Sequence, residues 1–155
     1  MKKNIVITGA NRGIGLALTK IFQQQGDTVY AVCRKTSPAL TALSVNVIEH
    51  VDVATDEGIN NLAKALSSVE IDVLVCSAGI LRDESLSDLN IETIREQFEV
   101  NAIAPLRIVE ALQKNISSGY AGSSCGKVAV ITSRMGSITD NGSGGRYGYR
   151  MSKAA

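Results

Sequence analysis

Short apolar, β-branched runs recur along the chain, and the segments between them carry apolar residues at helical spacing. The runs predict buried strands at residues 4–9, 27–34, 45–53, 71–79 and 126–133. Three- and four-residue spacing of the apolar positions predicts helices over residues 14–26, 56–68 and 88–116. We expect the last helix to bend near Asn101 and Pro105, because proline interrupts the backbone hydrogen bonds of a helix.

This alternation of strands and helices predicts one fold class. It indicates an α/β, Rossmann-type, doubly wound parallel sheet with helices on both faces, since crossover connections are right-handed. The 155 residues suffice for a single domain, residues 1–155. In such sheets ligands bind beyond the carboxyl ends of the strands. The small polar residues that follow strands one, four and five therefore belong to one candidate site.

Composition narrows the possible partners. The 16 basic and 15 acidic residues are spread along the chain, which argues against nucleic acid and anionic membranes and favours a small molecule. The apolar run after Lys2 and Lys3 is too short for a signal peptide, and no stretch approaches the length of a membrane span. Cys33, Cys76 and Cys125 lack metal or redox spacing, so we expect reduced thiols and a cytoplasmic protein.

A glycine-rich turn joins the first strand to the first helix. Gly9, Gly13 and Gly15 lie where a phosphate can approach the backbone closely and meet the amide groups of a helix N-terminus. The same residues also serve a purely structural turn, and that alternative stays open on position alone. No Gly-Lys-Ser/Thr ending follows Gly9, so the spacing disfavours an ATP or GTP P-loop.

Several motifs occur together in the order typical of one enzyme family. Residues 8–15 (TGANRGIG) resemble the cofactor motif of the short-chain dehydrogenase/reductase family. Residues 76–79 (CSAG) resemble its Asn-Asn-Ala-Gly segment, with both asparagines replaced. Asn101, Ser133 and the pair Tyr149 and Lys153 match its catalytic set. Within the family, residues 131–155 most resemble the branch that contains the C-factor signalling protein and sniffer-type carbonyl reductases.

The proposed chemistry follows from the last of these motifs. Carbonyl reduction by a nicotinamide hydride requires a proton donor at the developing alkoxide. Tyr149 is the candidate acid, and Lys153, four residues later on the same helical face, favours its phenolate form. A tyrosine followed four residues later by a lysine often occurs by chance, so this pair alone proves little. Tyr147 is better interpreted as a loop or substrate-pocket residue. The resemblance implies that Ser133 orients the substrate carbonyl, although serine there also suits a strand-ending cap.

Asn101 is unusual inside an apolar helical stretch, because a buried amide without partners costs roughly 1 to 3 kcal/mol. The resemblance implies that its backbone carbonyl, exposed at a helix bend, holds a water that relays protons between Lys153 and solvent.

The end of the second strand predicts the cofactor. An NAD site usually places a carboxylate there, whereas this chain has Arg34 and Lys35, with Arg12 in the glycine turn. Guanidinium groups suit a 2′-phosphate, so NADP(H) is favoured over NAD(H); alternatively Arg34 and Lys35 merely solvate the strand end. The resemblance also implies that Asp52 and Val53 contact adenine. The predicted cofactor-binding residues are Gly9, Asn11, Arg12, Gly13, Ile14, Gly15, Arg34, Asp52, Val53, Ala78, Gly79, Asn101, Tyr149 and Lys153.

Two other patterns are set aside. Residues 122–126 fit G-x-S-x-G, but they precede a strand, whereas the nucleophile elbow of a hydrolase follows one. His50 is the only histidine and lies in a predicted strand, which leaves little material for a catalytic triad or a histidine-rich metal site.

The resemblance implies an NADP(H)-dependent oxidoreductase that interconverts a carbonyl and an alcohol and forms a homodimer or homotetramer at full length. The alternative is a nucleotide-binding signalling or regulatory protein of the same fold. In the family, further strands and the substrate lid follow the lysine. We therefore expect the chain to be a piece of a longer protein, with low stability and activity by itself.

Overall fold

The structure is a computed structural model that describes residues 2–117, 126–140 and 142–155. In chain order its elements are β1 (Asn4–Thr8), α1 (Gly13–Gln24), β2 (Thr28–Val32), α2 (Pro38–Thr41), β3 (Asn46–Ile48), α3 (Asp56–Ala65), β4 (Val73–Cys76), α4 (Ile91–Phe98), the π-helical turn η1 (Glu99–Ile103), α5 (Ala104–Ser117), β5 (Lys127–Val130), the 3-10 turn η3 (Arg134–Gly136) and α6 (Tyr147–Ala154). Residues 122–125 of the G-x-S-x-G pattern, which include Cys125, lie outside the described residues.

The described strands form one parallel sheet in the order β3-β2-β1-β4-β5. This confirms the predicted doubly wound fold. Thr8 pairs with Val32 on one side and with Cys76 on the other, and Cys76 pairs with Val130. The carboxyl ends of four strands therefore meet at one edge. The strand order reverses between β1 and β4, which is where sheets of this class bind ligands.

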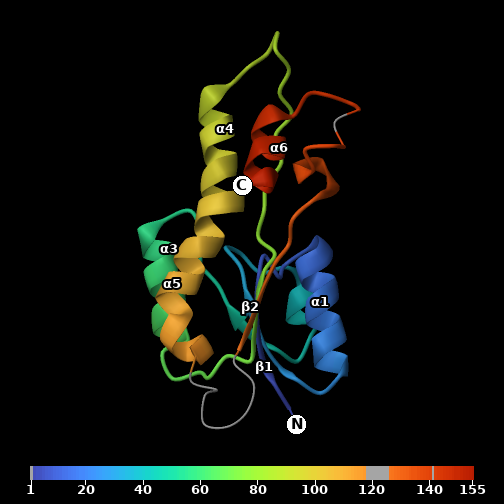
Figure 1. The fold of residues 1–155 in the computed structure, drawn as a ribbon. Coiled ribbons are helices and arrows are strands. Elements are labelled where there is room, and N and C mark those ends of the chain that lie inside the picture. The colour runs from blue at the N-terminus through green and yellow to red at the C-terminus, as the bar shows by residue number, and fades with distance from the viewer. Residues whose placement is uncertain (1, 118–125, 141) are drawn as a thin grey trace.

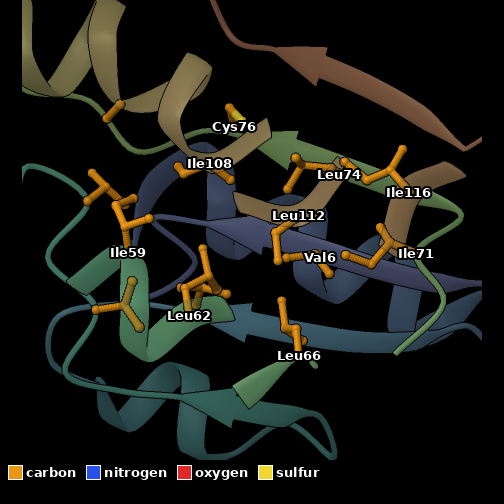
Figure 2. Close-up of a cluster of buried hydrophobic side chains, with 14 residues drawn as sticks. Val6, Ile59, Leu62, Leu66, Ile71, Leu74, Cys76, Ile108, Leu112 and Ile116 are labelled. Atoms are coloured by element: carbon orange, nitrogen blue, oxygen red, sulfur yellow. The ribbon is translucent and has the colours of Figure 1, made fainter. Parts of the chain in front are cut away.

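Helices cover both faces of the sheet (Figure 1). α3 and α5 lie on one face and α1 on the other, while α4 and α6 extend side by side beyond the carboxyl edge. Successive residues of β1 feed the two interfaces, because side chains of a strand alternate between faces. Val6 packs with Leu62, Leu74 and Leu112 in the cluster of Figure 2. Ile5 and Ile7 join the opposite cluster, which includes Leu40 of α2.

The strands are shorter than predicted, in most cases at both ends. The third run was predicted over residues 45–53, but β3 ends at Ile48. His50 has a φ of 60° and is exposed, so the prediction that it lies in a strand was wrong. The short helix α2, absent from the sequence prediction, begins after Ser37, whose hydroxyl accepts a hydrogen bond from the Leu40 N–H at 3.2 Å.

The predicted helix over residues 88–116 is divided into three parts. Asn90 caps α4, since its side-chain oxygen accepts hydrogen bonds from the N–H groups of Glu92 and Thr93. The interruption predicted near Asn101 and Pro105 is present as the π-helical turn η1, and Pro105 follows it in the first turn of α5. Because α5 continues directly from η1 and proline has no N–H, position 105 cannot donate to the Asn101 carbonyl four residues earlier.

None of the helices in the described ranges combines the length and apolar character needed to cross a membrane.

Substitution of Leu112 tests the assignment of the core on the α5 side of the sheet. It is fully buried, so we expect Leu112→Ala to lower the free energy of unfolding by about 2 to 5 kcal/mol. Leu106 lies on the same helix and is 71% exposed, so Leu106→Ala changes it by about 0.5 kcal/mol or less. Denaturant unfolding of the two variants measures the difference. Equal losses would contradict the assignment of the core.

Candidate active site

A cleft of about 600 Å³ opens at the carboxyl edge of the sheet, between the β1–α1 turn and α6. Apart from Asn101, all of the predicted site residues line it: Gly9, Asn11, Arg12, Gly13, Ile14, Gly15, Arg34, Asp52, Val53, Ala78, Gly79, Ser133, Tyr149 and Lys153. They come from six separate parts of the chain, and the parallel sheet brings them together.

The glycine turn is a tightly packed seat. Gly9 has a φ of 68°, and a Cβ built on it would lie 2.8 Å from the Ala78 Cα. A Cβ on Gly15 would lie 2.3 Å from the carbonyl oxygen of Gly9. Larger residues at either position would push α1 or the β4 loop out of place. The first-turn amides of α1 therefore face the cleft at close range, an arrangement that suits phosphate oxygens.

The loop after β4 is held by a buried hydroxyl. Thr8, fully buried at the end of β1, accepts hydrogen bonds at its Oγ1 from the N–H groups of Ser77 and Ala78, at 3.1 and 3.2 Å. These amides therefore leave the β4 ladder, which explains why β4 ends at Cys76. These hydrogen bonds support the turn after β4, in which Cys76 and Ser77 stand where the family segment has two asparagines. In the sequence, the feature that could have indicated this support is Thr8, a polar residue at the end of an apolar strand.

Polar residues at the other end of the cleft come from the glycine turn and from the segments that follow β2 and β3. Arg12 is exposed, and the Arg34 guanidinium lies 3.7 Å from the Asp52 carboxylate. The Asn11 side chain donates to the carbonyl of Lys35 at 3.0 Å. Two cationic side chains thus border this end of the cleft, and Asn11 connects the glycine turn to the segment after β2. The side chains of Arg34 and Asp52 already pair with each other in this structure.

Tyr149 and Lys153 lie one turn apart on α6 and both face the cleft. The Lys153 Nζ lies 5.9 Å from the centre of the Tyr149 ring and donates a hydrogen bond to the Ile131 carbonyl at 2.9 Å. Burial lowers the pKa of Lys153 below its usual 10.5. Tyr147 begins α6, so it lies in a helix and not in a loop, and it does not line this cleft.

Ser133 and Asn101 differ in how they reach the site. Ser133 lines the cleft, while its Oγ accepts a hydrogen bond from the Met135 N–H at 3.2 Å as the cap of η3. Asn101 is 5% exposed and lies beneath the cleft. Its side chain forms two hydrogen bonds with the backbone of Ile80 and donates to the Ser152 hydroxyl at 3.0 Å. Its amide is thus fully partnered and joins the β4 loop to α6.

Cleft residues that the sequence analysis missed include Arg82 and Glu96, which form an ion pair of 3.1 Å, as well as Val100 and Ile131. Two buried residues behind α6, Glu84 and Gln97, were also missed. No motif marks them, because their positions follow from the packing of α4 against α6. Cys33 and Cys76 are buried free thiols. Burial raises the pKa of both, that of Cys76 to about 11, so they stay protonated at neutral pH.

The environment of Lys153 predicts its titration. In a spectrum of ¹³C-labelled lysine side chains, we expect the Lys153 signal to titrate below 10.5, because burial disfavours the charged ammonium. The folded state binds this proton more weakly than the unfolded chain, so its contribution to stability rises as the pH rises toward 10.5. Lys153→Met identifies the signal. A midpoint at or above 10.5 would contradict the burial described for this amine.

The sequence was compared with protein families and with curated proteins. Residues 3–155 match the family model described as short chain dehydrogenase. The chain is 35% identical over 153 residues to 1-hydroxy-2-glutathionyl-2-methyl-3-butene dehydrogenase of Rhodococcus sp. (strain AD45), covering 97% of this chain and 65% of that protein. It is 40% identical over 86 residues to C-signal of Myxococcus xanthus, covering 55% of this chain and 49% of that protein. The chain thus spans less than two thirds of the length of these relatives.

Solved structures agree with the fold. The structure of the putative carbonyl reductase Sniffer of Caenorhabditis elegans superimposes with a TM-score of 0.86 at 30% identity, covering 100% of this chain and 75% of that one. A putative short-chain dehydrogenase/reductase from Burkholderia multivorans with bound NADP gives a TM-score of 0.84 at 27% identity, covering 100% and 69%. With the family match over nearly its whole length, the chain belongs to the short-chain dehydrogenase/reductase family of oxidoreductases, with C-signal and sniffer-type carbonyl reductases among its relatives.

Proposed function

We propose that the protein is an NADP(H)-dependent oxidoreductase that interconverts a carbonyl and an alcohol, with Tyr149 as the acid and base. The observation that carries this proposal is the presence of Tyr149, Lys153 and Ser133 in the same cleft as the glycine turn. The close-packed Gly9 and Gly15 and the first-turn amides of α1 fit a dinucleotide pyrophosphate. When bound, reduced nicotinamide supplies a hydride to the carbonyl carbon.

The protein's own residues manage the proton. Ser133 and Tyr149 donate hydrogen bonds to the substrate oxygen, and the Tyr149 hydroxyl transfers its proton as negative charge develops there. Lys153, whose ammonium lies near the Tyr149 ring, stabilises the phenolate that is left. The backbone carbonyl of Asn101 in η1 holds a water that returns a proton through Lys153. The π-helical register of η1 supports this role, since such turns often occur at functional sites.

Arg12 and Arg34 are proposed to bind the 2′-phosphate of NADP(H). Their place at the end of β2 and in the glycine turn supports this choice, as do the solved relatives with bound NADP or NADPH. Binding of the phosphate would replace the exposed Arg34–Asp52 ion pair and leave the Asp52 carboxylate to accept a hydrogen bond from adenine.

A signalling or regulatory protein that binds the nucleotide with little turnover is the second candidate. The specific observation that favours it is the 40% identity to C-signal over 86 residues. The two functions share the cofactor seat and differ in whether Tyr149 has a chemical task, so substitution of this tyrosine separates them.

Tyr149→Phe tests the catalytic assignment. In the full-length protein, we expect NADPH oxidation with a panel of ketones and aldehydes to fall by about 10²- to 10⁴-fold, the usual contribution of a general acid. NADPH binding remains. Tyr147→Phe, a matched change two residues away and outside the cleft, retains activity. Unchanged turnover in Tyr149→Phe would refute the assignment. Wild-type protein that binds NADPH without turnover would favour the signalling candidate.

Arg34→Gln tests cofactor choice. Loss of a charge-assisted hydrogen bond worth about 1.5 to 3 kcal/mol predicts a Kd for NADPH about 10- to 100-fold higher, with the Kd for NADH unchanged. Lys20→Gln, an exposed change on α1 outside the cleft, serves as the control. Fluorescence titration of the reduced cofactors gives both constants. Equal weakening of NADPH and NADH binding would contradict a role at the 2′-phosphate.

A further inference from the structure

The helix that carries Tyr149 has a second, buried face. Tyr149 and Lys153 line the cleft, whereas Gly148 and Ser152 are the buried residues of α6. These residues also lie one turn apart; Gly148 faces α4, and Ser152 bonds to Asn101 of η1. In Figure 1, α6 lies beside α4 beyond the sheet, so contacts on this face set where Tyr149 stands relative to the cleft. The contacts at both turns are polar and buried.

The start of α6 receives no cap from its own segment. The residue before it, Arg146, has a φ of 52°, makes no side-chain capping bond, and the first turn contains no acidic residue. Glu84, from the segment between β4 and α4, supplies what is missing. Its Oε2 accepts a hydrogen bond from the Gly148 N–H at 3.3 Å, and its backbone carbonyl accepts one from the Arg146 N–H at 2.9 Å. A carboxylate also suits the positive end of a helix.

Gln97 of α4 fixes the Glu84 carboxylate in place. Its Nε2 donates to the Glu84 Oε1 and to the Thr93 carbonyl, and its Oε1 accepts from the Arg82 N–H at 2.9 Å. Gln97 is fully buried and Glu84 is 6% exposed. Both carboxylate oxygens are thus used, which offsets the large cost of burying a charge.

Packing leaves this arrangement little freedom. A Cβ on Gly148 would lie 2.5 Å from the Gln97 Nε2 and 3.0 Å from the Ile94 Cα. The helix can therefore approach α4 this closely only with glycine at position 148. One turn later, Ser152 accepts from Asn101 and donates to the Tyr149 carbonyl at 2.9 Å. The Glu84–Gln97 pair holds the first turn of α6, and Asn101 holds the second.

We propose that Glu84 is a positioning residue that, held by Gln97, sets the place of the Tyr149 hydroxyl relative to Ser133 and the cofactor. This inference rests on the proposed function for its effect on turnover, since general acid catalysis requires the acid within hydrogen-bond reach of the substrate oxygen. Glu84 touches neither substrate nor cofactor, because it does not line the cleft. The phosphate-binding part of the cofactor seat is built on β1, β2 and β4, whereas α6 contributes Tyr149 and Lys153 beside it, so displacement of α6 slows the chemical step more than it weakens cofactor binding.

Glu84→Gln is a nearly isosteric test. The carboxylate accepts from two donors, Gln97 Nε2 and Gly148 N–H, whereas an amide brings one acceptor and one donor group. Turning the Gln97 amide over only moves the conflict to the Arg82 N–H. In the full-length protein we expect kcat to fall by about tenfold or more, since small misplacements of reacting groups slow catalysis strongly. The Kd for NADPH, from fluorescence titration, changes by a smaller factor than kcat.

The exchange variant, which combines Glu84→Gln with Gln97→Glu, distinguishes positioning from general damage. The amide introduced at position 84 donates to the side chain at position 97 and accepts from Gly148, and the carboxylate introduced at position 97 still accepts from the Arg82 N–H. Only the bond to the Thr93 carbonyl is lost. We expect kcat to recover to within about threefold of the wild type, whereas Gln97→Glu alone, with two facing carboxylates, remains impaired. Asp83→Asn is the neighbouring control, because Asp83 pairs with Arg146 at the surface and its side chain is 74% exposed.

A ¹³Cζ-tyrosine NMR spectrum tests the placement of Tyr149 independently of turnover. We expect the Tyr149 signal to shift in Glu84→Gln, to return in the exchange variant and to stay unchanged in Asp83→Asn. A wild-type position of this signal together with a wild-type kcat would overturn the inference, as would losses of kcat and NADPH affinity in equal measure. If the wild type shows no turnover, the proposed function fails, and the NMR shift alone decides whether Glu84 positions Tyr149.

Discussion

The close contact between the β1–α1 turn and the β4 loop is the constraint on which the site depends. Gly15 packs against the Gly9 carbonyl, and Gly9 packs against the backbone of Ala78. The buried Thr8 hydroxyl binds the same loop through its amides. These contacts bring the N-terminus of α1 and the end of β4 to one edge of the sheet. The cleft is the space that remains beyond that edge, and these two segments form its floor.

The opposite wall of the cleft is held in a different way. α6 contacts the sheet region through Lys153, whose ammonium donates to the Ile131 carbonyl and whose own carbonyl accepts from the Thr132 hydroxyl at 3.0 Å. Its buried face meets α4 and η1 through Gly148 and Ser152. The floor therefore suits recognition of a dinucleotide, and the wall carries Tyr149, the proposed acid. For the proposed reaction, misplacement of α6 therefore affects proton transfer more than cofactor binding, because most of the cofactor seat lies on β1, β2 and β4.

Periodicity predicted the sheet because β1 is buried on both faces and reads as a continuous apolar run. The motifs then indicated the site residues, since the parallel topology brings the strand ends together. The ends of the elements were harder to predict. Strand lengths depended on tertiary bonds such as that of Thr8, and the position of His50 depended on a turn that no local pattern marks.

The residues that support α6 could not be predicted from the sequence, for a related reason. Glu84 and Gln97 read as ordinary polar residues of a loop and a helix, and they are buried only because Gly148 allows α6 to approach α4. The contact that identifies Glu84 as a supporting residue is its hydrogen bond with Gly148, 64 residues later in the sequence. A single sequence does not contain that information in any local window, whereas the structure shows it as two hydrogen bonds to one carboxylate.

The central claim is that this cleft binds reduced nicotinamide and transfers its hydride to a carbonyl carbon. The most direct measurement is incubation of the full-length protein with NADPH that carries deuterium at both C4 positions of the nicotinamide, together with a panel of ketones and aldehydes, followed by mass spectrometry of the alcohols. The account predicts deuterium at the carbinol carbon of a product. NADPH that binds in the cleft but transfers no deuterium to any carbonyl of the panel would contradict it.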